Sequence, residues 1–322
     1  MVKRENSQPE DNETGHAPDV SVIIVNWNLR DFLRRCLVSI RSQSGNLTVE
    51  TIVVDNASGD GSTGMMEKEY PEVSRIINSE NAGFARACNQ GIKEAGGRYL
   101  FLLNNDAELL EGVLSSLVGF MDAHPEIGVC GPRVVNSDGT LQIQSKGFYP
   151  SIPRIAGQLL LPGYSRHPGG RSLGLYEFND DMKIKEFDWL SGCALLVRRK
   201  AVEDVGLLDA GVFMYCEDID WCYRMKQAGW KVVNLPQANV LHFGGQSMKL
   251  QKGAIVGSHA AGLAAFYARY HSRPATTVLR IILSAGYVVQ AIGWMLAAAV
   301  GRREGIDKLK RLFSHGRGRA AK

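Results

Sequence analysis

The chain has 322 residues, of which 45% are hydrophobic, so it can bury a substantial core in one large domain or two small ones. Its six cysteines form no CxxC pair, and we expect buried, reduced thiols instead of a zinc site or a disulfide framework. The net charge of +4 is concentrated in residues 302–322, which disfavours a general nucleic-acid-binding surface and favours a local contact with something anionic, such as a membrane face.

The N-terminal part of the chain begins with a polar segment. Residues 1–19 have mixed charge and no apolar periodicity, which predicts a disordered leader without the hydrophobic region of a signal peptide. Residues 20–25 are largely β-branched, with Ser21 as the one polar residue, and this predicts a first buried strand that ends at Asn26. A helix is expected to begin near Asp31, because apolar residues then recur at helical spacing.

A second buried strand is predicted for residues 50–54, and it ends at Asp55 and Asn56. A loop rich in turn-forming residues follows. A carboxylate and an amide at a strand end can bind the edge of a base and the hydroxyls of a ribose. The structural alternative is a turn with a helix N-cap.

Residues 73–77 predict a third strand, after which Asn81 and Gly83 precede a helix that ends at Gly96. Strands and helices alternate up to this point, and each polar cluster follows a strand. This order is typical of a mononucleotide-binding α/β half-domain. Neither a GxGxxG nor a GxxxxGK[ST] motif is present, which disfavours the dinucleotide-binding and P-loop classes.

The most informative stretch is the apolar run of residues 99–103, which stops at Asn104, Asn105 and Asp106. Ligands bind at the carboxyl ends of strands in open α/β sheets. An aspartate at that edge can hold a hard divalent cation that also binds substrate phosphates. The alternative is a polar strand end that turns into a loop.

The middle of the chain is less regular. A helix is expected over residues 113–121, a strand over 127–135 and a hairpin turn over 136–139. Residues 148–186 are rich in Gly, Pro, Tyr and Arg without a clear apolar period, which indicates a binding loop or lid. The sequence predicts no helix or strand in this segment.

Three carboxylates lie close together after a predicted strand at residues 193–197: Glu217, Asp218 and Asp220. Carboxylates embedded among aromatic residues are costly to desolvate, which favours a functional role. The alternatives are the favourable dipole at a helix start and, for Asp220, an ion pair with Arg224. Further along, a strand is expected over residues 231–235 and a separate segment over 238–241. They lead to His242, which is a candidate ligand or a buried core histidine.

Seven motifs occur in order: SVIIVNWN, IVVDNASGDGS, NSENAGFARACNQG, YLFLLNNDA, WLSGCALLVRR, FMYCEDIDWCYR and VLHFGGQS. Together they resemble the GT-A inverting glycosyltransferases of family 2, in particular the bacterial branch with rhamnosyl- and galactofuranosyltransferases. The resemblance covers residues 20–270 and implies an α/β, Rossmann-like, mostly parallel sheet flanked by helices. It implies a nucleotide-binding half at 20–110, an acceptor and catalytic half at 111–270, and a C-terminal helical extension at 271–322.

The resemblance also implies roles for the residues that match its motifs. Asp218 matches the catalytic base and Glu217 is its partner in the Glu-Asp pair. Asp106 matches the metal-holding member of the DxD element, and His242 matches a further metal ligand. The expected donor- and acceptor-binding residues are Asn26, Asp55, Asn56, Asn81, Gly83, Asn104, Asn105, Trp189 and Gly192.

The activity implied is a metal-dependent inverting transfer, with Mg²⁺ or Mn²⁺, from a nucleoside diphosphate sugar to a saccharide or lipid-linked saccharide. We expect dTDP-rhamnose as the donor first, and UDP-galactofuranose or another hexose donor next. Asn104 stands where a full DxD has Asp, which motivates the alternative of a catalytically weak nucleotide-sugar-binding or scaffolding protein. A nucleotidyltransferase is disfavoured because no Gly-rich, basic loop follows the first strand. No nucleic-acid partner is expected.

The C-terminal segment predicts a membrane contact. Residues 281–300 are mostly apolar and would span about 30 Å as a helix. A single crossing conflicts with a cytosolic donor site and a cytosolic basic tail. We therefore favour peripheral attachment to the inner face of the plasma membrane, with anionic lipids as partner, over one crossing. Packing on the catalytic domain or on a dimer partner is the remaining alternative.

Overall fold

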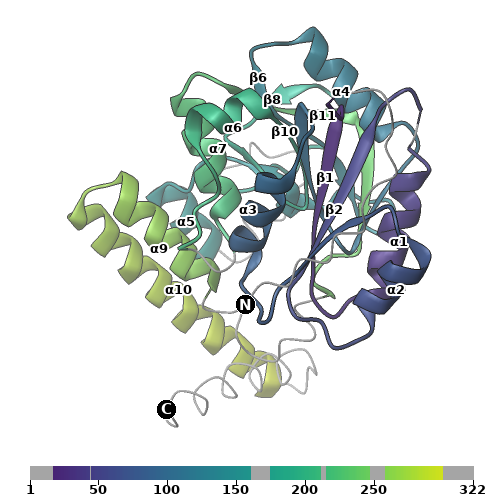
Figure 1. Cartoon of the computed structure of the whole chain (residues 1–322). Coiled ribbons are helices and arrows are strands. Elements are labelled where there is room, and N and C mark those ends of the chain that lie inside the picture. The colour runs from purple at the N-terminus through teal and green to yellow at the C-terminus, as the bar shows by residue number, and fades with distance from the viewer. Residues whose placement is uncertain (1–16, 44, 161–174, 212–214, 247–257, 300–322) are drawn as a thin grey trace. The chain divides into compact units, whose positions relative to one another are not determined.

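The computed structural model describes residues 17–43, 45–160, 175–211, 215–246 and 258–299 (Figure 1). Most of the expected leader and the whole basic tail lie outside these residues. The chain divides into two compact units. Unit 1 comprises Met1–Gly147, Asp180–Phe213 and Glu217–Ser247, and unit 2 comprises Phe148–Asn179, Met214–Cys216 and Met248–Lys322.

The N-terminal half of unit 1 forms four parallel strands. They are β1 (Val20–Asn26), β2 (Val49–Asp55), β3 (Ser74–Ile77) and β4 (Tyr99–Asn104), in the order β3-β2-β1-β4. Each coincides with a predicted strand. β1, β2 and β4 contain apolar runs, as strands buried on both faces require, whereas β3 is partly exposed. The register places Asn26 beside Asp55 and Val25 beside Asn104, so the polar strand ends meet at one edge.

The sheet continues beyond β4 with β10 (Ala194–Arg198), β6 (Ile127–Val135), β11 (Lys231–His242) and β5 (Ala107–Leu109). The short β8 (Lys185–Glu186) pairs with β11, which makes nine strands among the described residues. Strand β10 is antiparallel to both neighbours, β6 and β11 are parallel, and β5 is antiparallel to β11. The predicted mostly parallel α/β sheet is confirmed.

Helices cover both faces of this sheet (Figure 1). Helices α1 (Arg30–Arg41), α2 (Ser62–Glu69) and α4 (Val113–Ala123) share a buried apolar cluster with alternate residues of the strands, such as Val22 and Val53. On the other face, α3 (Phe84–Glu94) packs on β1 and β2. Helices α6 (Arg199–Val205) and α7 (Glu217–Gln227) contact each other.

Three short elements complete the described part of unit 1. The 3-10 turn Ile143–Ser145 leads into β7 (Lys146–Gly147), which pairs with β9 (Trp189–Leu190) in a separate two-stranded sheet.

All six cysteines are free and buried, as predicted.

Unit 2 consists of α5 (Ile152–Leu160), α9 (Ser258–Tyr270) and α10 (Arg273–Ala299) in its described part. Helix α5 forms inside the segment for which the sequence predicted no element. Helix α10 contacts α5 and α9, and Gly286 allows the close approach of Leu159, since an added Cβ would lie 2.8 Å from the Leu159 Cβ. Within the described residues, α10 is the helix long and apolar enough to cross a membrane, over Arg273–Gly293, by length and composition.

Candidate active site

The strand ends of β1, β2 and β4 carry a buried network of amides around Asp55. The Asn26 side chain donates a hydrogen bond to Asp55 Oδ2 at 2.8 Å, and Asn105 donates to Asn26 Oδ1 at 2.7 Å. The Ser58 backbone N–H donates to the other Asp55 oxygen at 2.8 Å. These hydrogen bonds fix the three strand ends relative to one another. Asp55 is only 1% exposed. A contact between Asp55 and a base remains a prediction.

The loop before α3 is tied to the end of β2 by Asn56. Its side-chain amide donates to Asn81 Oδ1 at 3.3 Å and to the Gly83 carbonyl at 3.4 Å. Gly83 has a φ of +83°, which glycine adopts without strain. An open cavity of about 230 Å³ lies beside this loop, lined by Glu80, Asn81, Ala82, Arg86, Ala210 and Gly211.

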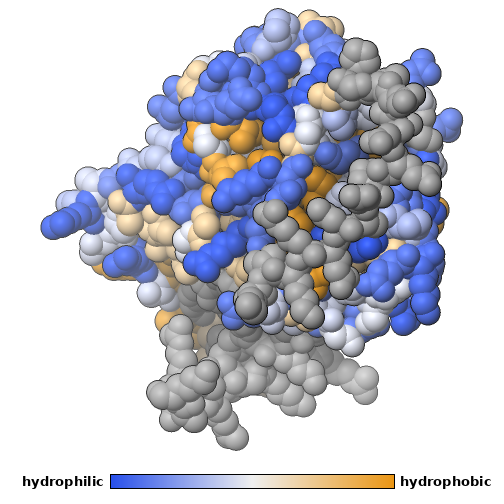
Figure 2. All heavy atoms as spheres, in the orientation of Figure 1, coloured by the Kyte–Doolittle hydropathy of each residue, from blue (hydrophilic) through white to orange (hydrophobic). Residues whose placement is uncertain are grey.

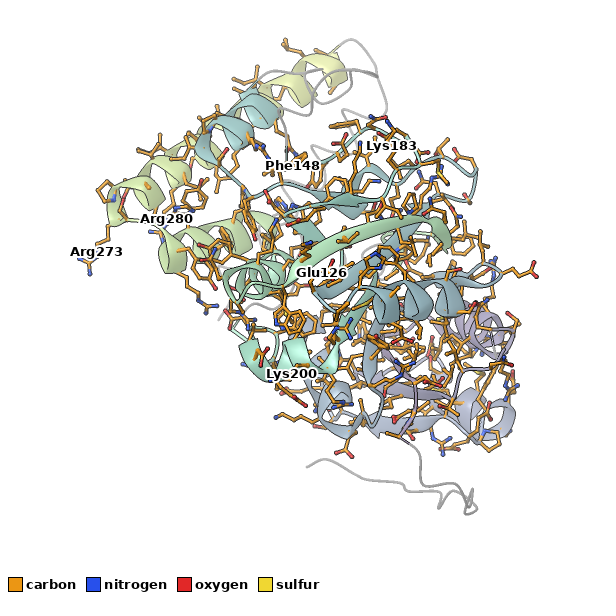
Figure 3. The ribbon with its side chains drawn as sticks, turned by 90° about the horizontal axis from the view of Figure 1, so that it is seen from above. Glu126, Phe148, Lys183, Lys200, Arg273 and Arg280 are labelled. Carbon is orange, nitrogen blue, oxygen red and sulfur yellow. The ribbon has the colours of Figure 1, made fainter. Side chains whose placement is uncertain are left out.

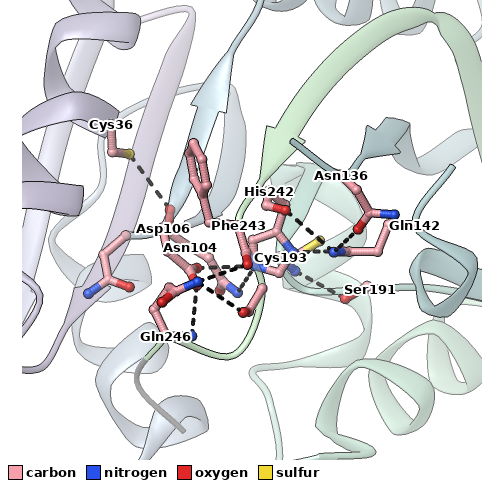
Figure 4. A network of polar contacts seen from close by, with 12 residues as sticks. Cys36, Asn104, Asp106, Asn136, Gln142, Ser191, Cys193, His242, Phe243 and Gln246 are labelled. Atoms are coloured by element: carbon pink, nitrogen blue, oxygen red, sulfur yellow. Dashed lines mark hydrogen bonds and ion pairs between the residues drawn. The ribbon is translucent and has the colours of Figure 1, made fainter. Parts of the chain in front are cut away.

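Asp106 and His242 lie side by side, although they are far apart in the sequence (Figure 4). Strand β5 follows Asp106 directly and pairs with the end of β11, so that Ala107 is opposite His242. His242 Nε2 is 3.1 Å from Asp106 Oδ1 and 3.2 Å from Asn104 Nδ2. The Gln246 backbone N–H lies 3.4 Å from the other Asp106 oxygen.

This cluster suits a divalent cation. An aspartate oxygen and an imidazole nitrogen are ligands that Mn²⁺ and related ions accept, and the remaining positions can go to water and phosphate oxygens. Among the described residues, no group of three or more His, Cys, Asp or Glu side chains is placed to hold a metal.

The second acidic site lies at the start of α7. Asp218 is partly exposed, and its carboxylate accepts hydrogen bonds from the backbone N–H groups of Gly192 at 3.1 Å and Ile219 at 2.8 Å. Burial in the protein raises the Asp218 pKa above its usual value, although these two hydrogen bonds act in the opposite direction. A carboxylate with a raised pKa that reaches the surface is suited to accept a proton.

Glu217 precedes Asp218 but has different surroundings. It is 6% exposed, and its Oε2 atom has no hydrogen-bond partner among the described residues. Burial, followed by the negative charge of Asp218, raises the Glu217 pKa. The third carboxylate, Asp220, forms an ion pair with Arg224 at 2.9 Å, which is the alternative to a functional role given for it above.

Residues 192 and 193 connect the two acidic sites. The Asn104 backbone N–H donates to the Cys193 carbonyl at 2.9 Å, while the adjacent Gly192 N–H binds Asp218. The charges of Asp106 and Asp218 both contribute to the raised pKa of the Cys193 thiol, after burial. The same short segment therefore binds the Asp218 carboxylate and the end of β4, which is two residues before Asp106.

Gly192 and Trp189 differ in what they can contact. An added Cβ on Gly192 would lie 3.4 Å from the Phe84 ring and 3.9 Å from the Asp218 Cβ, so Gly192 lies between the start of α3 and the start of α7. Trp189 is 4% exposed and belongs to β9, where it pairs with Gly147. That Trp189 forms one wall of the acceptor site remains a prediction.

Sequence analysis did not identify Gln142 or Gln246. Gln142 Oε1 lies 2.6 Å from His242 Nδ1, and the two residues are 100 positions apart. The predicted hairpin turn after residue 135 was the available signal, because it returns the chain to the end of β6. The turn alone does not predict that Gln142 contacts His242.

Comparison with known proteins gives the family. The model of glycosyl transferase family 2 matches residues 21–206. An N-acetylglucosaminyl-diphospho-decaprenol L-rhamnosyltransferase of Mycobacterium tuberculosis is 28% identical over 78% of this chain and 84% of its own length. A low-salt glycan biosynthesis hexosyltransferase of Haloferax volcanii is 25% identical over 69% of this chain and 66% of its own.

Solved structures give the fold. The structure of GalNAc-T7 with UDP, GalNAc and Mn²⁺ has a TM-score of 0.53 at 19% identity, over 71% of this chain. That of S. aureus TarS has a TM-score of 0.51 at 18% identity, over 70% of this chain. The chain spans 44% and 36% of those two proteins. By the family match and the GT-A architecture, the chain belongs to glycosyl transferase family 2.

Proposed function

We propose that the chain transfers a sugar from a nucleoside diphosphate donor to a saccharide acceptor with inversion at the anomeric carbon. The observation that supports this most is that residues 192 and 193 bind both Asp218 and Asn104, and Asn104 is two residues before Asp106. One carboxylate lies at the end of β4, where a donor diphosphate is expected, and the other is partly exposed and set to accept a proton.

In the proposed reaction, Asp218 accepts the proton of the attacking acceptor hydroxyl. The acceptor oxygen forms a bond to the anomeric carbon as the bond from that carbon to the phosphate oxygen breaks, and its electron pair leaves with the nucleoside diphosphate. The Gly192 and Ile219 N–H groups hold the Asp218 carboxylate in place. A base positioned in this way contributes about 10²- to 10⁴-fold in rate.

A divalent cation, Mg²⁺ or Mn²⁺, would be held by Asp106 and His242. When bound, it neutralises negative charge on the leaving diphosphate. Asn26, Asn105, Asn56 and Asn81 shape the donor side through the hydrogen bonds described above. Asn104 donates its backbone N–H to Cys193 and its side-chain amide to His242, so it connects the donor side with the segment that holds Asp218.

dTDP-rhamnose is the proposed donor, because the M. tuberculosis relative is named an L-rhamnosyltransferase. That name also supports a lipid-linked saccharide as acceptor. UDP-galactofuranose is the next donor to test. The second candidate function is a catalytically weak protein that binds nucleotide sugars, and Asn104 in the position of the first DxD aspartate favours it.

The substitution Asp218→Asn tests the catalytic assignment. It removes the proton acceptor and keeps the side-chain shape, so we expect turnover to fall by about 10²- to 10⁴-fold while the affinity for the donor is unchanged. Steady-state kinetics and calorimetric donor binding measure the two quantities. Asp31→Asn, at a 71% exposed side chain, is the control and should leave both unchanged. Near-normal turnover of Asp218→Asn would refute its role as the base.

We also propose that α10 attaches the protein to an anionic membrane surface on the cytoplasmic side. One side of α10 is buried within unit 2 through Leu279 and Leu283. Apolar residues at helical spacing lie exposed elsewhere on it, and they include Ile281, Val288, Ile292, Met295 and Leu296. Figure 3 shows Arg273 and Arg280 at the beginning of this helix, and both are exposed. An apolar stripe with basic residues suits a helix that lies in the membrane interface.

A further inference from the structure

Gln142 is held in a fixed place at the end of β6, next to the proposed cation site. Its backbone N–H donates to the Val134 carbonyl at 2.9 Å, and Leu141 forms an antiparallel bridge with Val135. The intervening turn is closed by Asn136, whose backbone N–H donates to the Thr140 carbonyl at 2.9 Å. Since β11 runs alongside β6, its last residue, His242, lies next to Gln142 (Figure 4).

The contacts of the Gln142 side chain determine which way its amide faces. The Nε2 atom lies 3.2 Å from Asn136 Oδ1 and 3.5 Å from the His242 carbonyl oxygen, and both of these atoms are acceptors. The amide oxygen therefore faces His242 Nδ1, at 2.6 Å. An amide oxygen only accepts hydrogen bonds, so the proton in this contact belongs to Nδ1.

A neutral imidazole with its proton on Nδ1 has a lone pair on Nε2. The Asn104 amide can donate to that lone pair from 3.2 Å. The Asp106 carboxylate, 3.1 Å away, cannot donate, so a nitrogen lone pair and a carboxylate oxygen lie side by side. A bound cation would stabilise this arrangement, because both atoms could then serve as ligands.

We propose that Gln142 is a positioning residue that keeps His242 in the tautomer whose Nε2 binds the divalent cation beside Asp106. The inference rests on the metal site of the proposed function and names the residue that prepares it. Partners of this kind, which bind the other nitrogen of a metal-ligating histidine, typically contribute about 10- to 100-fold in metal affinity. Gln142 itself touches neither the sugar nor the reacting atoms in this account.

Three substitutions in the full chain test the role. Gln142→Leu removes the acceptor for Nδ1–H, Gln142→Glu keeps an acceptor there, and Gln144→Leu changes an exposed glutamine in the same turn. MnCl₂ is titrated in the presence of excess dTDP, and free Mn²⁺ is followed by electron paramagnetic resonance. We expect Gln142→Leu to weaken Mn²⁺ binding about 10- to 100-fold, while Gln142→Glu and Gln144→Leu stay within about threefold of wild type. Thermal melting checks that Gln142→Leu is folded.

The tautomer is read separately in the metal-free protein. The ¹⁵N resonances of the His242 ring are assigned by their loss in His242→Asn, and we expect a proton on Nδ1 in the wild type and a mixture of tautomers in Gln142→Leu. A wild-type ring protonated on Nε2, or a folded Gln142→Leu variant that binds Mn²⁺ like wild type, overturns the inference.

The outcome is separable from that of the proposed activity. Neither readout uses turnover, so Gln142-dependent Mn²⁺ binding in a protein that transfers no sugar supports the inference and refutes the activity. A wild-type protein that binds dTDP but no Mn²⁺ overturns the inference and leaves a metal-independent transfer to be tested by Asp218→Asn.

Discussion

Glu217 and Asp218 are neighbours in the sequence with different surroundings, and this difference supports the roles proposed for them. Glu217 is buried, and burial together with the charge of Asp218 raises its pKa from 4.5 to about 8. Asp218 is partly exposed, and two backbone N–H groups stabilise its charged form. Burial raises the pKa of Asp218 as well, but Asp218 is the member of the pair that reaches the surface and binds backbone N–H groups, so we propose Asp218 as the base.

The protonated state of Glu217 makes stability depend on pH. The unfolded chain releases this proton above its usual pKa, while the folded protein retains it up to about pH 8, so the contribution of Glu217 to stability is greatest at low pH and falls as the pH rises through this window. Glutamine does not titrate. We expect the unfolding free energy of Glu217→Gln, relative to wild type, to increase from about pH 5 to about pH 8 and then level off.

Urea unfolding at several pH values across this window measures the difference. Glu67→Gln, at an exposed residue of α2, controls for the loss of a carboxyl group. A Glu217→Gln difference that is constant across the window would show that Glu217 is ionised in the folded protein.

At the residue scale, the sequence predicted the candidate site residues more completely than it predicted the contacts between them. The pairing of Asp106 with His242 was expected from motifs alone, and the two side chains do lie together. The burial of Asp55 could not be predicted, because it depends on the amides of Asn26 and Asn105, which reach Asp55 only after β1, β2 and β4 align. The position of Gln142 depends in the same way on the pairing of β6 with β11.

At the scale of elements, continuous apolar runs were sufficient to predict the buried strands. Strand β11, near one end of the sheet, was harder to predict. The sequence indicated a strand over residues 231–235 and a separate segment over 238–241, whereas the structure has one strand, β11, with an irregular register between Leu235 and Asn239. Pro236 lies in this irregular part, where a missing N–H is tolerated. The short helix α5 follows Ser151 and has Pro153 in its first turn, but these start signals lie in a segment rich in Gly and Pro without a clear apolar period.

Two glycines in helices of unit 1 predict opposite effects of the same substitution. A Cβ on Gly91 of α3 would lie 2.5 Å from Ile23 Cγ2 in the core, so Gly91→Ala forces α3 away from β1 and should cost about 1–3 kcal/mol. Gly64 of α2 has no atom within 4 Å of an added Cβ, so Gly64→Ala should stabilise the protein by about 0.4–1 kcal/mol.

Denaturant unfolding of the two variants beside wild type measures both effects. Equal effects, or a stabilising Gly91→Ala, would contradict the close packing of α3 on β1.

At the scale of the whole molecule, the sequence predicted an apolar C-terminal segment, and the structure extends it into a helix that begins earlier, at Arg273. Figure 2 shows hydrophobic residues among hydrophilic ones over α9 and α10. The basic residues 302–322 lie outside the described part of the chain. The sequence could show that the segment is apolar, but which of its sides is covered depends on the contact of α10 with α5.

Membrane attachment through α10 predicts a specific loss. Leu296 is 65% exposed, and placing a charge there removes apolar transfer energy of about 1.5–3 kcal/mol, so Leu296→Glu should weaken binding to anionic vesicles by about tenfold or more. Cosedimentation with phosphatidylglycerol vesicles measures this. Val38→Glu, at a 55% exposed apolar residue of α1, is the matched control and should bind like wild type.

High salt should release the wild-type protein, because lipid charges are screened. Vesicle binding by Leu296→Glu equal to that of wild type, or release from cell membranes by detergent alone, would contradict peripheral attachment.

The most direct test of the central claim is calorimetric binding of a panel of nucleotide sugars, with and without Mn²⁺. The account predicts that dTDP-rhamnose binds to the wild type in a Mn²⁺-dependent manner, and that Asp218→Asn binds it equally well but does not release dTDP in the presence of acceptor. Failure of every nucleotide sugar to bind, with either Mg²⁺ or Mn²⁺ present, would contradict it.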